Sequence, residues 1–177
     1  MKKVFTVKDF SVSKEDFDLL YDEKLDMLVT SPMPSLSDLP KYYQNTEYIS
    51  HTDANKSLFE KMYQFVKRIN LKGKINLVEK FAGKKGNILD IGAGTAEFLL
   101  TAKNSGWSVV GFEPNESARN LAISKGVSMI DNLANIPPKS LDVITLWHVL
   151  EHIPDYNEKI DLFKQLLKDD GTLVVAV

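Results

Sequence analysis

A short apolar strand followed by a glycine turn constrains the fold of this 177-residue chain more than any other feature. Residues 87–100 read NILDIGAGTAEFLL, in which the strand reaches Asp90, Gly92 and Gly94 follow one residue apart, and a helix pattern with an apolar face begins. Such a turn lets the backbone approach a nucleotide-like ligand closely and directs the N–H groups of a helix N-terminus toward it. The segment therefore predicts a nucleotide-binding α/β fold.

A second acid closes the next predicted strand. Glu113 follows the run SVVGF at 108–112, about one strand–helix–strand unit after Asp90. An acid at this place can accept hydrogen bonds from both hydroxyls of a ribose. The glycine turn and Glu113 together predict a cofactor that contains ribose.

The dinucleotide fingerprint G-x-G-x-x-G is the competing interpretation of this turn, and it would make the chain an NAD-dependent oxidoreductase. Counting from Gly92, the third glycine of that fingerprint falls on Glu97, a charged residue. Dinucleotide turns also usually follow an apolar strand without an acid two residues before the first glycine, where this chain has Asp90. Both departures disfavour a dinucleotide.

The pattern Asp90-x-Gly92-x-Gly94-x-Ala96 resembles motif I of the class I S-adenosylmethionine-dependent methyltransferases, acid-x-Gly-x-Gly-x-Gly. Ala96 stands at the third glycine, a small change that costs little room. The resemblance continues in the segments IDNL at 130–133, LDVITLWHVLEHIPD at 141–155 and LLKDDGTLVV at 166–175. It covers about residues 74–177 and preserves the order and spacing of the motifs.

This resemblance implies S-adenosylmethionine as the cofactor, S-adenosylhomocysteine as its product and a small molecule as the methyl acceptor. Asp131 would accept from the exocyclic amine of the adenine, with neighbouring residues flanking the ring, and Trp147 would line the pocket. The cofactor-binding residues that it implies are Asp90, Gly92, Ala93, Gly94, Glu113, Pro114, Asp131, Asn132, Leu133, Trp147 and His148. A non-catalytic module that binds S-adenosylmethionine is the further alternative.

His148 and His152 are the candidate catalytic residues, because they follow the fourth strand, where the family places the reacting methyl group. Histidine is the natural base near neutral pH, and a base is needed only if the acceptor arrives protonated. In the alternative interpretation, His152 only holds its loop through backbone hydrogen bonds.

The same segment matches the H-x-x-E-H pattern of inverzincin metalloproteases, with Glu151 as the base. On one helix the two histidines would share a face and could bind zinc. His148 is expected at a strand end, however, and Pro154 disfavours a long helix through the motif. The sequence therefore predicts no metal site.

The second half of the chain alternates between strand and helix patterns, which predicts a Rossmann-like doubly wound parallel sheet. Strands are expected at 87–91, 107–112, 127–130, 141–147 and 172–177, and helices at about 95–105, 115–125 and 155–168. Right-handed crossovers bring the loops after the strands to one edge, so Asp90, Glu113, Asp131 and Trp147 should meet there.

The first half predicts an N-terminal hairpin and a helical lead-in. The hairpin is expected from 17–21 and 25–29, and two helices, 56–72 and 75–81, from apolar positions interrupted at Gly73. Two domains follow: a hairpin and lid segment at 1–54 and the cofactor-binding domain at 55–177. Four residues could close over the cofactor as a lid: Tyr42, Tyr43, Tyr48 and His51.

The apolar strand 172–177 ends the sequence, whereas related methyltransferases continue with a helix and an antiparallel strand pair. We therefore expect a chain truncated after the fifth strand, with an exposed edge through which it could form a homo-oligomer. The net charge of −2 disfavours nucleic acid as a partner, and no apolar run approaches the ~20 residues of a membrane span. The absence of cysteine and of a signal-peptide pattern favours the cytoplasm.

Overall fold

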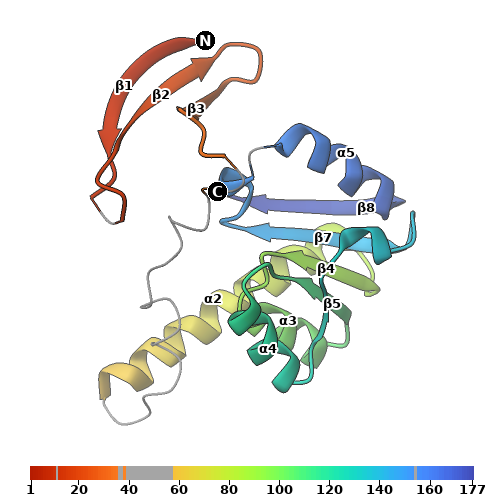
Figure 1. The fold of residues 1–177 in the computed structure, drawn as a ribbon. Helices are drawn as coiled ribbons and strands as arrows, with labels where there is room; N and C mark the ends of the chain where they lie inside the picture. Colours follow the sequence, from red (N-terminus) through yellow and green to blue (C-terminus); the bar gives the residue numbers. More distant parts are fainter. Residues whose placement is uncertain (11, 36–37, 39–57, 154) are drawn as a thin grey trace. The chain divides into compact units, whose positions relative to one another are not determined.

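The computed structural model describes residues 1–10, 12–35, 38, 58–153 and 155–177, with the side chains of 58–61 left out (Figure 1). The chain divides into two compact units, Met1–Asp53 and Ala54–Val177. The residues of the predicted lid, Tyr42, Tyr43, Tyr48 and His51, lie outside the described residues, as does Pro154.

The first unit contains a three-stranded antiparallel sheet in the order β1-β2-β3. Strands β2 (Asp16–Asp22) and β3 (Met27–Ser31) form the predicted hairpin, which is confirmed. Strand β1 (Lys2–Lys8) was not predicted, because lysines at both ends hide its short apolar centre, which pairs with β2. None of the described side chains in this unit is buried.

The second unit is built on a parallel sheet in the order β6-β5-β4-β7-β8, which confirms the doubly wound prediction. Its strands are β4 (Asn87–Ile91), β5 (Ser108–Phe112), β6 (Ser128–Ile130), β7 (Leu141–Trp147) and β8 (Leu167–Ala176). Strand β8 starts earlier than the expected residue 172, because its pairing with β7 includes an irregularity between Leu141 and Val143. β8 lies at one edge of the sheet.

Helices cover both faces of this sheet (Figure 1). Helices α3 (Glu97–Asn104) and α4 (Glu116–Ser124) share one face with α2 (Leu58–Ala82), and α5 (Tyr156–Leu166) lies on the other. Short 3₁₀ turns, η2 (Leu133–Asn135) and η3 (Leu150–His152), follow β6 and β7. Among the described residues, no helix is long and apolar enough to cross a membrane.

The lead-in is one helix, α2, and the prediction of a break at Gly73 was wrong. A glycine inside a helix costs only about 1 kcal/mol relative to alanine. Ile75 and Val78, which follow it, are buried in the core beside α3, and this packing outweighs the cost. The helix ends before Gly83, which has a φ of +69°, as the sequence predicted.

Candidate functional site

The glycine turn after β4 is tied to the end of the neighbouring strand β5. The N–H groups of Gly92 and Ala93 both donate to the carbonyl oxygen of Phe112, at 2.8 and 3.1 Å. Gly92 has a φ of +69°, and a Cβ atom added to it would lie 2.4 Å from Cγ2 of Val149. Glycine is therefore required at this position by both the backbone conformation and the space.

Ala96 occupies the third glycine position of motif I and starts helix α3 as its N-cap. Its side chain is fully buried, so the expectation that alanine finds room here is confirmed. Its φ of 64° nevertheless lies in the left-handed region, which costs an L-residue roughly 1–2 kcal/mol. The cost of replacing glycine is conformational and not steric.

Glu113 reaches the glycine turn from the end of β5. Its Oε2 accepts from the N–H of Gly94 at 2.8 Å, and its Oε1 accepts from the N–H of Asn115 at 2.9 Å. Arg119 donates to the carbonyl oxygen of Glu113 at 2.7 Å and so braces the same corner. Both carboxylate oxygens are thus fixed beside the turn, next to the exposed Pro114.

Asp90 is buried, with 3% of its surface exposed, and its Oδ1 accepts from the hydroxyl of Thr145 at 2.6 Å. The two residues are register partners on β4 and β7. Burial raises the pKa of Asp90 to about 7, against the opposing effects of the Thr145 hydrogen bond and the Lys74 charge, and Glu113 adds a smaller rise. The carboxyl group therefore lies near its ionisation midpoint at neutral pH.

Lys74 of α2 lies over the ring of Trp147, with its Nζ 4.4 Å from the ring centroid. Burial lowers the pKa of Lys74, and the charge of Asp90 partly opposes this effect. Trp147 also packs edge-on against Phe98 at a centroid distance of 5.4 Å. Its buried Nε1 has no hydrogen-bond partner in the part of the chain that the structure describes.

The loop after β6 carries the predicted adenine-binding residues. The side chain of Asp131 is exposed and accepts from Nδ2 of Asn135 at 3.5 Å. Asn132 caps the 3₁₀ turn η2 by accepting from the N–H of Ala134 at 2.9 Å. Leu133 is 9% exposed and belongs to the core cluster that includes α5, so little of its side chain faces solvent.

His148 and His152 follow β7 but do not share a helix. His148 has a φ of 58°, and its N–H donates to the carbonyl oxygen of Ala176 at 2.7 Å. Its side chain is 68% exposed, with Nδ1 3.9 Å from Oε1 of Glu151. The turn η3 begins only at Leu150, so the one-helix geometry of the metalloprotease pattern is absent from this described segment.

Glu97 stands where a dinucleotide fingerprint would have its third glycine. Its carboxylate pairs with Lys125 at 2.8 Å and with Lys67 at 3.4 Å. Burial raises the pKa of Glu97, but the two lysines outweigh this effect and lower it overall. A charged side chain anchored between α2 and the end of α4 is unlike the close helix–strand packing of a dinucleotide turn.

The structure thus places Asp90, the glycine turn, Glu113, Asp131 and Trp147 at the carboxyl ends of β4, β5, β6 and β7, the edge where the sequence expects them. Three further residues at this edge were not predicted: Lys74, Thr145 and Val149. Thr145 could have been found from the sequence, because it is a polar residue inside the apolar strand 141–147. Lys74 and Val149 had none, since their places depend on how α2 and the loop after β7 pack.

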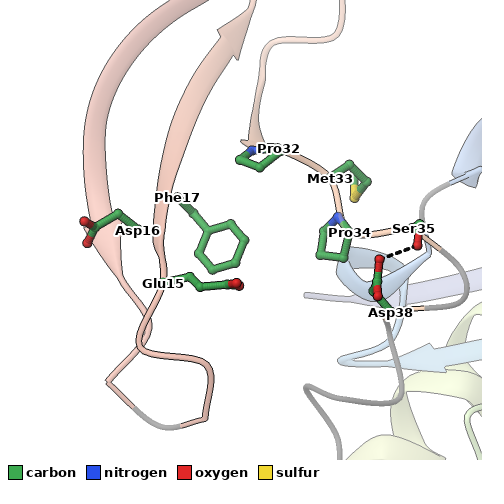
Figure 2. Close-up of a pocket in the computed structure, with 8 residues that line it drawn as sticks. All are labelled: Glu15, Asp16, Phe17, Pro32, Met33, Pro34, Ser35 and Asp38. Carbon is green, nitrogen blue, oxygen red and sulfur yellow. Dashed lines mark hydrogen bonds between the residues drawn. The ribbon is translucent and has the colours of Figure 1, made fainter.

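A separate hollow lies in the first unit and contains none of the predicted site residues (Figure 2). Its lining combines acidic and apolar side chains: Glu15, Asp16, Phe17, Pro32, Met33, Pro34, Ser35 and Asp38. Ser35 donates to Asp38 at 2.6 Å across its rim (Figure 2). The lining has no basic side chain and none of the predicted site residues, so the hollow is not the candidate site.

The sequence of the second unit matches a known protein family. A family model described as a methyltransferase domain matches residues 56–177, which is more than half of the chain. The chain belongs to this methyltransferase domain family. The match spans the glycine turn, Glu113 and the segment with both histidines, and it supports the methyltransferase prediction over the NAD-dependent and non-catalytic alternatives.

A similar curated protein is the ubiquinone biosynthesis O-methyltransferase of Actinobacillus pleuropneumoniae, 34% identical over 105 residues, or 51% of this chain and 44% of the relative. The chain therefore spans less than half the length of that relative. A solved S-adenosylmethionine-dependent methyltransferase from Archaeoglobus fulgidus matches with a TM-score of 0.50 and 25% identity, covering 63% of this chain and 52% of the other.

The magnesium protoporphyrin IX methyltransferase of Synechocystis, solved with its bound cofactor, shares the fold. The TM-score is 0.55, the identity 17%, and the match covers 75% of this chain and 73% of that protein.

Proposed function

We propose that this methyltransferase-family chain binds S-adenosylmethionine at the carboxyl edge of its parallel sheet and transfers the methyl group to a small molecule. The observation that carries the proposal is the fixed position of Glu113, whose carboxylate accepts from the N–H of Gly94 at 2.8 Å. An acid held beside a glycine turn at this edge is placed to accept from ribose hydroxyls. The family membership and the names of its solved neighbours support the choice of cofactor.

The residues present fit such a cofactor. Gly92 packs against Val149, and the N–H of Gly94 donates to Glu113, so backbone without side chains lies beside the carboxylate that would bind the ribose. In the proposal Gly92, Ala93 and Gly94 form the floor, Glu113 binds the ribose, and Pro114 borders it. Asp131 and Asn132 would bind the adenine from the loop after β6, with a small contribution from Leu133.

S-adenosylmethionine, when bound, supplies a methyl group activated by a sulfonium. The protein then needs mainly to position the reactants in line and to exclude water, for which the partly buried ring of Trp147 is suited. If the acceptor is a hydroxyl, a base must remove its proton. His148 and His152 are our candidates for that base, and both side chains are exposed to an incoming acceptor.

We propose an oxygen atom of a small molecule as the acceptor, on the printed names of the curated O-methyltransferase relatives. A cytoplasmic location, no nucleic-acid partner and self-association through the β8 edge also remain proposals of ours. Because the chain covers less than half of those relatives, activity of the whole protein could require residues beyond this sequence.

Calorimetric titration with S-adenosylhomocysteine, with NAD as the control ligand, tests the cofactor assignment. The proposal predicts micromolar binding of S-adenosylhomocysteine and no heat from NAD. Binding of NAD alone would replace the proposal with a dehydrogenase. Binding of neither would exclude a cofactor site in this chain, and the proposal would then be withdrawn for it.

A further inference from the structure

The N-terminal half of helix α2 carries an apolar stripe that faces away from the core. This half of the helix extends beyond the sheet and the other helices of its unit (Figure 1). The large apolar side chains of the stripe recur at the spacing of one helix face, and each is more than half exposed: Met62, Phe65, Val66 and Ile69. Leu71 packs against the core and follows Met62 by about two and a half turns, so the core and the stripe lie on opposite faces.

The sequence around the stripe is strongly basic. Residues 61–78 contain five Lys or Arg residues and no Asp or Glu, in a chain whose net charge is −2. Lys67 pairs with Glu97, but Arg68 and Lys72 are exposed and have no carboxylate partner among the described residues. Because they are four residues apart, these two cations lie on the same flank of the stripe. They are available to an anionic partner.

A lipid surface with anionic headgroups fits both properties of this face. An amphipathic helix with an apolar stripe and basic neighbours lies in the plane of a bilayer interface, where its apolar side chains leave water and its cations meet the headgroups. A second copy of the chain fits less well. An antiparallel pair of α2 helices would bring the same basic flank of both copies together, with no acid between them.

We propose that the outer face of α2 binds an anionic lipid surface. Phe65 and Ile69 insert among the acyl chains, and Arg68 and Lys72 contact the phosphates of the headgroups. The inference is independent of the cofactor assignment, because the stripe faces away from the core and from the sheet that carries the glycine turn.

Co-sedimentation of the full chain with vesicles tests this inference. Vesicles of phosphatidylcholine and phosphatidylglycerol in about a 2:1 ratio should bind the chain, whereas phosphatidylcholine alone should bind it at least about tenfold more weakly. Phe65→Gln should lower the partition coefficient on the mixed vesicles about tenfold, because a large apolar side chain then no longer leaves water. Phe81→Gln, at a similarly exposed position near the other end of α2, is the matched control and should bind as the wild type does.

The basic flank is tested separately by combining Arg68→Gln with Lys72→Gln. This double variant should bind the mixed vesicles about 25-fold more weakly, since each basic side chain near an anionic surface contributes roughly a factor of five. Lys2→Gln combined with Lys8→Gln removes the same charge from exposed positions of β1 and should leave binding unchanged. Equal losses in the two double variants would show that binding follows net charge and not this face, which would overturn the inference.

Sedimentation velocity without lipid and titration with polyglutamate test the other occupants of the stripe. A dimer that Phe65→Gln dissociates would assign the stripe to a second copy. Binding of polyglutamate without binding of the mixed vesicles would assign it to an acidic polypeptide. Either result would overturn the inference, as would unaltered vesicle binding by Phe65→Gln, because the stripe would then not contact lipid. Urea denaturation should be the same for all these variants, since every substituted side chain is exposed.

Discussion

The two halves of the sheet's carboxyl edge differ in how firmly they are built. At β4 and β5, hydrogen bonds from Gly92, Ala93 and Gly94 fix the glycine turn to Phe112 and Glu113. Beyond β7, the side chains of His148 and His152 are exposed, and the only helical element between this strand and α5 in the described residues is the 3₁₀ turn η3. The contrast teaches that the glycine-turn half of this edge has its polar groups fixed by hydrogen bonds, whereas the histidine half leaves its side chains exposed.

Physical chemistry explains this difference. A cofactor that is bound through fixed donors and acceptors gains affinity when those groups are already oriented, because less freedom is lost on binding. Acceptor-binding groups lie on loops that vary and that gain their order from neighbouring segments. The buried Asp90–Thr145 pair and the exposed His148 ring are the two extremes of this arrangement.

The largest effect should come from Gly92→Ala. The new methyl group would meet Val149 at 2.4 Å and would force a φ of +69° on an L-residue. Overpacking and left-handed strain together should lower the free energy of unfolding by roughly 4 kcal/mol, measured by urea denaturation.

Gly83→Ala is the matched control, because Gly83 has the same φ of +69° but no neighbour within 4 Å of the added atom. It should lose only about 1–2 kcal/mol. Equal losses in the two variants would mean that the turn is not packed against Val149, and the contrast between the two halves would weaken.

Asp90→Asn should abolish a pH dependence of stability. The pKa of Asp90 is raised to about 7, so the folded protein keeps a proton that the unfolded chain releases above its ordinary value of 3.8. Stability therefore falls as the pH rises, by about 3 kcal/mol between pH 5 and pH 8 in the wild type. The asparagine variant should lack this fall, and it should be more stable than the wild type at pH 8.

Urea denaturation of both proteins across this pH range measures the difference. Parallel stability curves would show that Asp90 is not perturbed by its surroundings. The same variant should bind S-adenosylhomocysteine more weakly, by about 1–3 kcal/mol, because a charge-assisted contact is lost. Stabilisation together with weaker binding would identify Asp90 as a residue kept for function.

Glu113→Gln should weaken S-adenosylhomocysteine binding by about 2 kcal/mol, or roughly 30-fold, because a neutral amide replaces the charged ribose acceptor. Isothermal titration provides the number, and Glu116→Gln, at an exposed position two residues beyond Pro114, is the control with unchanged affinity. An unaltered affinity in Glu113→Gln would show that Glu113 does not bind the ribose.

The smallest effect should come from His148→Ala and His152→Ala. Both side chains are exposed, so cofactor affinity should change by less than about twofold, which for His148 departs from the cofactor contact that the sequence implied. A tenfold loss of cofactor affinity in either variant would show that the histidine half also contacts the cofactor, and the contrast between the two halves would fail. Once an acceptor is known, full methyl transfer by a single variant would eliminate the base role of the substituted histidine.

The parallel sheet could be predicted closely because its strands are nearly continuous apolar runs. The bounds of β4 and β7 agree with the predicted 87–91 and 141–147 to the residue. The edge positions of Asp90 and Glu113 then follow from parallel topology. Strand β1 and the unbroken helix α2 could not be predicted, because their patterns are weak until they pack against β2 and the core.

The site was predictable only where residues follow directly from strand ends. Thr145 reaches Asp90 through the register of β4 and β7, which no sequence pattern fixes. Lys74 reaches Trp147 through the rotation of α2 about its axis, set by the burial of Ile75 and Val78. The positions of Thr145 and Lys74 in the site therefore depend on contacts between elements that are distant in the sequence, which motifs do not encode.

A crystal structure of the chain with S-adenosylhomocysteine would test the central claim most directly. Our account predicts the ribose hydroxyls on the carboxylate of Glu113, above the turn that contains Gly92 and Gly94. A ligand bound away from this turn, or a ribose that leaves Glu113 without a contact, would contradict it.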